Sequence, residues 1–270
     1  MKNTTPGFRT RSPFKSSPGA IWLMKLFPLL LLSVFLAFSH IAVANDQVNP
    51  TVSSEVQPGP ASDMAAQYAS YDAVFKQAVA DDLAGKPQSA RKGYDVLQET
   101  EYDAQIATPS AVNLAVLGQF DAAKKAFHKI ATGPATQEAQ YASLWQLWLT
   151  ARTWTGSPAA LQKQLAKTAA NYRFTFPRYQ AIANLYAGKG SPEAIFSAVK
   201  AMPDTRLLAK GDAYTEATFF TGGYLQYATQ NNNAALQLYE REQVHLNNTS
   251  LEKPLIDTAT AALLATNHKS

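Results

Sequence analysis

Residues 117–127 read LGQFDAAKKAF, and the fold prediction starts from this stretch. Gly118 is followed by Ala123, Phe127 and Ile130, at steps of five, four and three residues. Steps of four and three place side chains on one face of a helix. Small residues such as Gly118 and Ala123 allow the chain to turn and two helices to approach closely. The stretch therefore predicts a helical hairpin that turns at Gly118 and buries the three residues that follow.

The same pattern recurs along the chain. Gly85, Ala90, Tyr94 and Leu97 repeat it 33 residues earlier. Looser copies are Gly156, Leu161, Leu165 and Thr168, then Gly190, Ile195, Val199 and Met202, and then Gln230, Ala235, Tyr239 and Glu242. The turn positions are spaced by 33, 38, 34 and 40 residues. Spacings of this size predict five stacked helix–turn–helix units, and their irregularity predicts a degenerate C-terminal half.

Composition predicts an all-α fold. From Asp63 onwards alanine, leucine and tyrosine are frequent, and glycine and proline fall between segments. Ser157-Pro158 and Ser191-Pro192 are typical helix starts, because serine caps free N–H groups and proline lacks one. The predicted helices are 63–84, 88–100, 109–117, 120–131, 136–153, 158–172, 176–187, 192–201, 210–229, 233–246 and 253–266.

The stretch 117–127 resembles the second half of a tetratricopeptide repeat (TPR). Gly118 matches the turn glycine of that motif, Ala123 its alanine, and Phe120 and Phe127 its two aromatic positions. The resemblance covers residues 71–131, with a degenerate echo at 216–246. The earlier copy departs from the motif at Pro87, which replaces the first aromatic, and Ala107 stands where tryptophan or tyrosine usually opens the first helix.

This resemblance implies antiparallel hairpins stacked as a TPR-like α-solenoid, with a concave groove that binds a protein or peptide. Exported bacterial proteins that resemble it often assist pilus assembly, secretion, or exopolysaccharide and cell-wall machinery. The motif indicates a helical hairpin and leaves the function open, because one fold serves many functions.

Residues 1–44 are predicted to be a signal peptide. An apolar run over 26–44 follows Lys25 and ends in Ala42-Val43-Ala44, the small residues that signal peptidase requires before its cleavage point. We expect cleavage after Ala44 and a periplasmic or secreted bacterial protein. Met24 is an alternative start, since Met24-Lys25 would begin a compact leader by itself. An uncleaved anchor is the other interpretation, because 19 residues can just span a bilayer.

The remaining chain divides into two parts. Residues 45–62 contain three prolines among Ser, Thr, Gln and Val, which predicts a disordered linker. Residues 63–270 are predicted to form the TPR-like helical repeat domain. We expect membrane contact only through an uncleaved leader or a partner.

Charge and cysteine content exclude several classes of function. Residues 1–44 contain five basic and no acidic side chains, so the rest of the chain has 19 basic and 20 acidic ones. This part of the chain is therefore nearly neutral and lacks the positive charge that is typical of nucleic-acid-binding proteins. The chain has no cysteine, which excludes a disulfide framework, thiolate metal sites and a lipid attached to cysteine after the leader.

No residues stand out as catalytic, cofactor-binding or metal-binding. Beyond the leader the histidines are His128, His245 and His268, and none has a second ligand type at helical spacing on an apolar face. The acidic clusters Asp81-Asp82, Glu99-Thr100-Glu101 and Glu240-Arg241-Glu242 are expected near helix ends or on solvated faces. We therefore predict no enzyme activity and no cofactor.

The aromatic residues Tyr141, Trp145, Trp148 and Trp154 are the candidate partner-binding residues. The first three follow steps of four and three on one predicted helix. Tryptophan and tyrosine dominate interface hot spots, which favours a binding face. The same spacing is also typical of a buried helical stripe, which favours packing between hairpins.

Together these patterns predict a non-catalytic protein–protein interaction scaffold or assembly factor of the bacterial cell envelope. The alternatives are an accessory or degenerate enzyme of cell-wall processing, and a membrane-anchored scaffold with an uncleaved leader.

Overall fold

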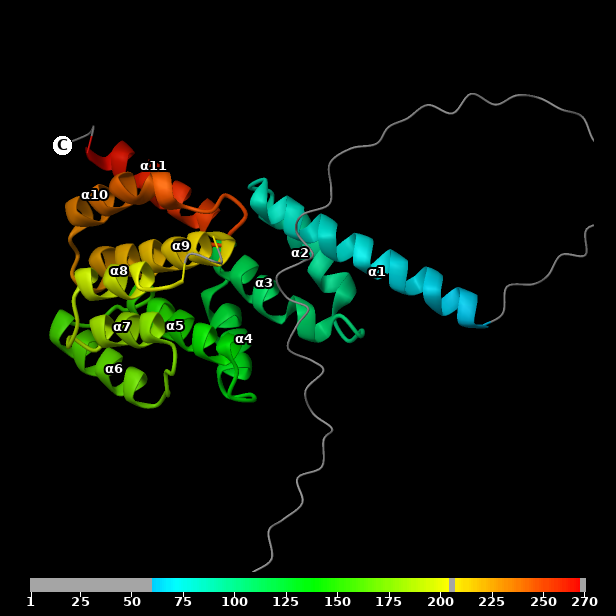
Figure 1. The fold of residues 1–270 in the computed structure, drawn as a ribbon, viewed down its shortest axis with the longest axis horizontal. Coiled ribbons are helices and arrows are strands. Elements are labelled where there is room, and N and C mark those ends of the chain that lie inside the picture. The colour runs from blue at the N-terminus through cyan, green and yellow to red at the C-terminus, as the bar shows by residue number, and fades with distance from the viewer. Residues whose placement is uncertain (1–59, 204–206, 268–270) are drawn as a thin grey trace, which may run out of the picture. The chain divides into compact units, whose positions relative to one another are not determined.

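The computed structural model describes residues 60–203 and 207–267, and every element of secondary structure in this part is helical (Figure 1). The all-α prediction is therefore confirmed for these residues. The helices are α1 Pro60–Leu83, α2 Pro87–Leu97, α3 Asp103–Val116, α4 Phe120–Ala131, α5 Gln137–Arg152, α6 Pro158–Ala170, α7 Pro177–Tyr186, α8 Pro192–Lys200, α9 Leu207–Gly223, α10 Asn232–Glu242 and α11 Lys253–Asn267. None of these helices is long and apolar enough to span a bilayer.

Only a small part of the predicted N-terminal segments falls within the described residues. The signal peptide 1–44, the cleavage position after Ala44 and most of the linker 45–62 lie outside the described residues. Helix α1 begins at Pro60, three residues before the predicted domain boundary at 63.

The helix starts at serine are confirmed. The Ser157 hydroxyl accepts the backbone N–H of Ala160 at 3.3 Å, and the Ser191 hydroxyl accepts that of Ala194 at 3.4 Å. Pro158 and Pro192 are the first residues of α6 and α8. The caps thus work as predicted, because they satisfy N–H groups that have no partner inside the helix.

The predicted start of the third helix at Pro109 is wrong. Helix α3 begins at Asp103, and Pro109 lies inside it. An internal proline removes one hydrogen bond and costs roughly 3 kcal/mol. Burial of Ile106, whose side chain is 2% exposed, offsets this cost, because Ile106 packs with Tyr94 and Leu97 in one core cluster.

Three turns between helices share one geometry. Gly85, Gly118 and Gly188 all have φ between +70° and +73°. After each glycine the next N–H bonds back to a carbonyl five residues earlier, as Gln119 does to Leu114 at 2.9 Å. This arrangement caps the C-terminus of the preceding helix and needs a left-handed residue. The fourth predicted turn is formed by Gly188 instead of Gly190.

Of the three positions predicted to be buried after each turn, the first two are buried in all five copies of the pattern, whereas Ile130, Thr168 and Met202 at the third position are only partly buried. The first buried position after each turn is occupied by Ala90, Ala123, Leu161, Ile195 and Ala235, and none is more than 3% exposed. The second position is occupied by Tyr94, Phe127, Leu165, Val199 and Tyr239, with at most 2% exposure. The predicted buried stripe is therefore confirmed at its first two positions.

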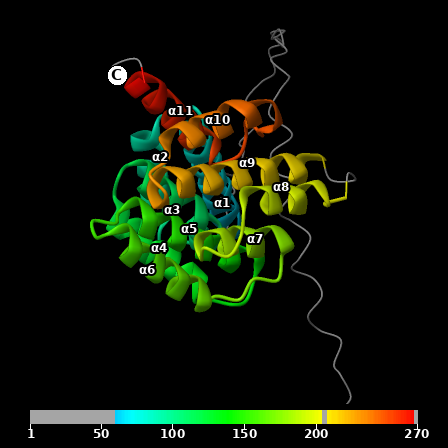
Figure 2. The ribbon, with the colours of Figure 1, turned by 90° about the vertical axis from the view of Figure 1, so that its left-hand side faces the viewer.

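Neighbouring helices along the chain pack side by side, and several helices two places apart also touch (Figure 2). Helix α5 contacts α4, α6, α7 and α9, and eleven of its sixteen residues are buried. The contact between α5 and α9 brings separate hairpins together over one main core. A smaller core cluster joins α1, α2 and the start of α3.

The turn between α1 and α2 approaches the start of α11. Helices α1 and α11 are in contact, and a cavity of about 120 Å³ lies between their ends. The cavity is lined by Asp82, Leu83, Gly85, Pro87, Val112, Val116, Leu251, Pro254 and Thr258. Residues far apart in the sequence therefore line one small cavity.

Candidate functional site

The aromatic residues on α5 lie in the core. Trp145 is fully buried, Trp148 is 5% exposed and Tyr141 is 8% exposed. Trp145 stacks on Phe127 at 4.9 Å between ring centroids, and Trp148 stacks on Phe219 at 5.2 Å. Their burial favours the packing interpretation and corrects the prediction that these three rings form a binding face. Helix α5 is buried on most sides because α4, α6, α7 and α9 all contact it.

Trp154 differs from the other three. It follows α5 and is only half-buried. Its indole N–H donates to the Ser157 carbonyl at 3.1 Å, which holds the ring over Gly156. A role for Trp154 in partner binding stays a prediction.

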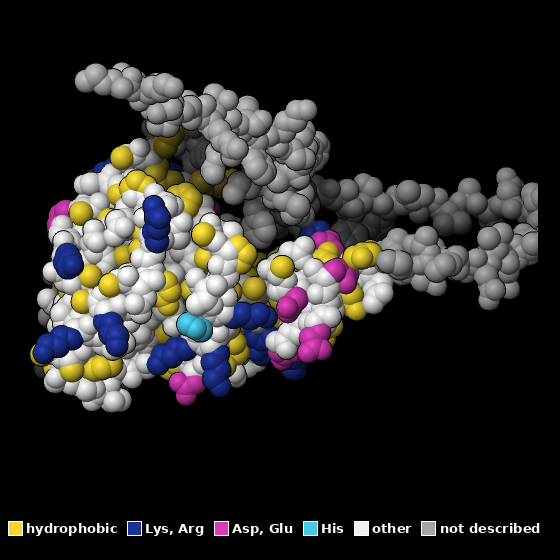
Figure 3. Space-filling model, turned by 90° about the horizontal axis from the view of Figure 1, so that it is seen from below, with side chains coloured by type: hydrophobic (Ala, Val, Ile, Leu, Met, Phe, Trp, Pro, Cys, Tyr) yellow, Lys and Arg dark blue, Asp and Glu magenta, His cyan; other side chains and the backbone are white. Residues whose placement is uncertain are grey.

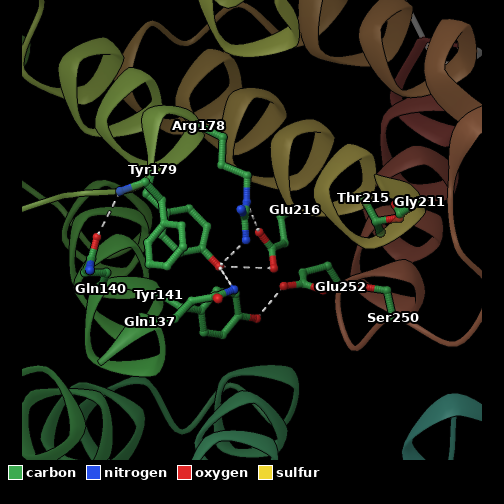
Figure 4. A network of polar contacts seen from close by, with 11 residues as sticks. Gln137, Gln140, Tyr141, Arg178, Tyr179, Gly211, Thr215, Glu216, Ser250 and Glu252 are labelled. Atoms are coloured by element: carbon green, nitrogen blue, oxygen red, sulfur yellow. Dashed lines mark hydrogen bonds and ion pairs between the residues drawn. The ribbon is translucent and has the colours of Figure 1, made fainter. Parts of the chain in front are cut away.

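A buried polar network connects α5, α7, α9 and the segment before α11 (Figure 4). Helix α5 supplies Gln137 and Tyr141, helix α7 supplies Arg178 and Tyr179, and helix α9 supplies Glu216. Glu252, 3% exposed, precedes α11. We call these residues the glutamate network.

The Tyr179 hydroxyl is the centre of one half of the glutamate network. It donates to Glu216 Oε1 at 3.3 Å and accepts from Arg178 at 3.1 Å and Gln137 at 3.5 Å. Arg178 Nε also contacts Glu216 Oε2 at 3.4 Å, and the guanidinium lies 4.3 Å from the centroid of the Tyr179 ring. Three helices are joined through this one hydroxyl.

Glu252 forms the other half. Its Oε1 accepts the Tyr141 hydroxyl, and its Oε2 accepts the Ser250 hydroxyl at 2.5 Å. Asn247 anchors the same segment to α9, because its backbone N–H donates to Thr215 and its amide donates to Asp212 at 2.6 Å. The segment before α11 is thus bonded to both α5 and α9.

Burial changes the protonation of both glutamates. Burial raises the pKa of Glu216 to about 8; the Arg178 guanidinium opposes part of this rise and the charge of Glu252 adds to it. Burial also raises the pKa of Glu252, although hydrogen bonds from Ser250 and Tyr141 oppose the change. Near neutral pH, Glu216 therefore holds a proton in a large share of molecules.

Raised carboxyl pKa values are typical of general acids, so the glutamate network is the best candidate for catalysis in the described part of the chain. Each of the four carboxylate oxygens, however, already accepts a hydrogen bond from the same molecule. The Glu216 and Arg178 side chains are only 14% and 13% exposed. This arrangement favours a role in holding helices together.

The three acidic clusters lie at or near helix ends, as predicted: at the end of α1, between α2 and α3, and at the end of α10. Two of their side chains make contacts that a solvated face would not. Asp82 accepts the Tyr94 hydroxyl at 2.9 Å and the Asn113 amide at 2.7 Å, so it joins α1 to α2 and α3. Glu242 is 8% exposed and pairs with Arg241. Within the described residues no group of three or more His, Asp or Glu side chains could hold a metal ion.

Sequence reasoning missed Glu216, Glu252 and Arg178. Tyr141 and Glu252 are 111 residues apart, and no local spacing signals such a pair. A glutamate among alanines and threonines, such as Glu216 in α9, was a weak hint of a buried charge.

Comparison with known proteins found no matching family model, no matching curated protein and no matching solved structure.

Proposed function

We propose that this chain is a non-catalytic protein–protein interaction scaffold or assembly factor of the bacterial cell envelope, built as a TPR-like α-solenoid. The observation that carries the proposal is the buried stripe shared by the five hairpins. A hairpin with one apolar face must stack on its neighbours, and its outward face stays free for other molecules. Pilus, secretion or exopolysaccharide machinery is the setting that the leader and the repeat pattern favour.

Photo-crosslinking in intact cells tests this proposal. A photo-reactive residue at Trp154, which is half-buried beside the α5–α6 turn, should give one discrete adduct with an envelope protein. The same probe at the exposed residue Gln237 of α10 is the matched control for non-specific capture. Identical adducts at both positions would contradict the scaffold proposal. So would the absence of adducts at both positions and at two further exposed positions, Val96 and Tyr68.

A cell-wall processing role is the second candidate, because the glutamate network contains two carboxyls with raised pKa values. Activity of the purified chain on peptidoglycan that disappears in Glu216→Gln, while the variant keeps its melting temperature, would replace the scaffold proposal. A purified chain without activity would exclude direct catalysis and would leave an accessory role in cell-wall processing as the alternative.

The proposed location is the periplasm or the outside of the cell. The N-terminal sequence of protein taken from the envelope distinguishes the alternatives, because Asn45 means cleavage after Ala44 and Met1 or Met24 means an uncleaved anchor.

A further inference from the structure

Charge is unevenly distributed along the folded chain. Residues 120–200 contain ten basic side chains (Lys and Arg) but only three acidic ones (Asp and Glu). Residues 60–119 contain four basic and eight acidic side chains. Figure 3 shows Lys and Arg side chains gathered on the face that carries α4 and α6, while Asp and Glu gather near α1 and α2. The near-zero net charge beyond the leader therefore conceals a basic surface.

Four lysines on α4 and α6 define this surface, which we call the lysine face: Lys125, Lys129, Lys163 and Lys167. All four are exposed. On each helix the two lysines follow the two buried stripe residues by two positions. Two residues correspond to about 200° around a helix, so the lysines point away from the core.

The lysine face lies on two helices that carry one acidic side chain, Asp121 of α4, one turn before Lys125. In the described part of the chain, none of its four ammonium groups has a carboxylate within ion-pair distance. Other lysines do pair, as the exposed Lys76 does with Asp72 at 2.7 Å and the mostly buried Lys253 with Asp257 at 2.5 Å. Two pairs of exposed lysines, each pair one helical turn apart, outnumber the single acidic side chain on these helices and leave a positive potential open to solvent.

The surroundings of these lysines discriminate between possible partners. Large exposed hydrophobic side chains in the described residues lie elsewhere, at Tyr68, Val96, Leu208, Val244 and Leu264. Protein interfaces are depleted in lysine and depend on aromatic anchors. Clusters of lysine on a helix surface without such anchors are typical of attraction to anionic lipid headgroups, without insertion into the hydrocarbon.

We propose that the lysine face docks this protein onto an anionic membrane surface. The attraction is electrostatic and non-penetrating, so α4 and α6 lie on the phosphate groups with the buried stripe facing inward. This inference goes beyond the sequence prediction, which allowed membrane contact only through the leader or a partner. It is independent of the scaffold proposal, which can hold without it.

A site-specific fluorophore on the full chain tests the proposal. Because the natural chain has no cysteine, Gln164→Cys provides a unique labelling position on α6, between Lys163 and Lys167. The matched control label is Gln237→Cys on α10, which Figures 1 and 2 place on the opposite side of the helices from α6. Each labelled chain is reconstituted in phosphatidylcholine vesicles with a headgroup quencher, with or without phosphatidylglycerol.

We expect the label at position 164 to be quenched only when phosphatidylglycerol is present, and to be released by high salt. Each lysine near an anionic surface contributes roughly fivefold in apparent affinity, so replacing all four by glutamine should return quenching to the level of neutral vesicles. Replacing Lys76, Lys86, Lys200 and Arg241 by glutamine removes the same charge elsewhere and should keep the quenching.

Three results would overturn the proposal: equal quenching in neutral vesicles, equal quenching of the label at position 237, or quenching that survives both high salt and the four substitutions. Salt-sensitive association between copies without lipid, lost in the same variant, would instead assign the lysine face to the acidic surface of a second copy. Melting curves show whether each variant is folded. The salt dependence of the unsubstituted chain tests the electrostatic attraction without any substitution.

Discussion

Gly223 shows how one missing methyl group shapes the core. A Cβ atom at this position would lie 2.3 Å from the Trp148 indole nitrogen. Alanine normally stabilises a helix interior by about 1 kcal/mol relative to glycine. Here the buried indole ring cannot move away, so overpacking exceeds that gain. We expect Gly223→Ala to lower the free energy of unfolding by about 1–3 kcal/mol in denaturant titrations.

Gly211 provides the matched control in the same helix. A Cβ atom there would meet only the Asn247 Cβ at 3.5 Å, which is ordinary contact. Gly211→Ala should therefore leave stability unchanged or raise it by up to about 1 kcal/mol. Equal destabilisation by both substitutions would show that the close approach to Trp148 is not the cause.

Gln230 tests the turn geometry at the same scale. Its φ of +54° is a left-handed conformation that costs a residue with a side chain about 1 kcal/mol or more. Gln230→Gly should stabilise the protein by about 0.5–1 kcal/mol, measured by thermal unfolding. Gly118→Ala should instead destabilise the protein, because the alanine would have to adopt the φ of +73° found at Gly118. A loss of stability in Gln230→Gly would contradict this account.

Helix α4 depends on its contact with α5. The Phe127 ring is fully buried and stacks on Trp145 with an interplanar angle of 7°. Phe127→Ala should cost about 3–5 kcal/mol and should also increase hydrogen exchange in α5, because the two helices share one core. The exposed substitution Lys125→Ala is the control and should change stability by less than about 0.5 kcal/mol. Exchange confined to α4 would contradict the shared core.

At the scale of elements, local patterns predicted much of the fold. The positions of Phe127 and Leu165 relative to their turns predicted burial, and Ser157 predicted a helix start, because these signals act within one or two turns of helix. Pro109 misled the prediction, since tertiary burial of Ile106 outweighs a local preference. The pairing of Tyr141 with Glu252 depends on contacts between distant segments, which no local pattern contains.

At the scale of the whole molecule, the glutamate network makes stability depend on pH. Folded Glu216 binds its proton more tightly than the unfolded chain does, with a pKa of about 8 against an ordinary value of 4.5. The contribution of Glu216 to the free energy of unfolding is therefore fully present below about pH 4.5, and it is lost as the pH rises through the folded pKa of about 8. The loss should be on the order of a few kcal/mol, measured by denaturant unfolding across this range.

Glu216→Gln should flatten this dependence, because glutamine stays neutral and keeps an oxygen acceptor for Tyr179. Some dependence should remain, since burial also raises the pKa values of Glu252 and Asp212. A variant whose stability falls as steeply as that of the unsubstituted chain would show that Glu216 is not the group that titrates.

The contact between α1 and α11 limits how this protein can evolve. In an open array, gene duplication can add a hairpin at either end, and the new copy needs only one neighbour. Here an extra hairpin inserted between α2 and α10 would push Asp82 and Pro254 apart and expose the cavity that they line to water. An insertion of this kind is therefore disfavoured, whereas substitutions on the outward faces of the helices leave the contact between α1 and α11 intact.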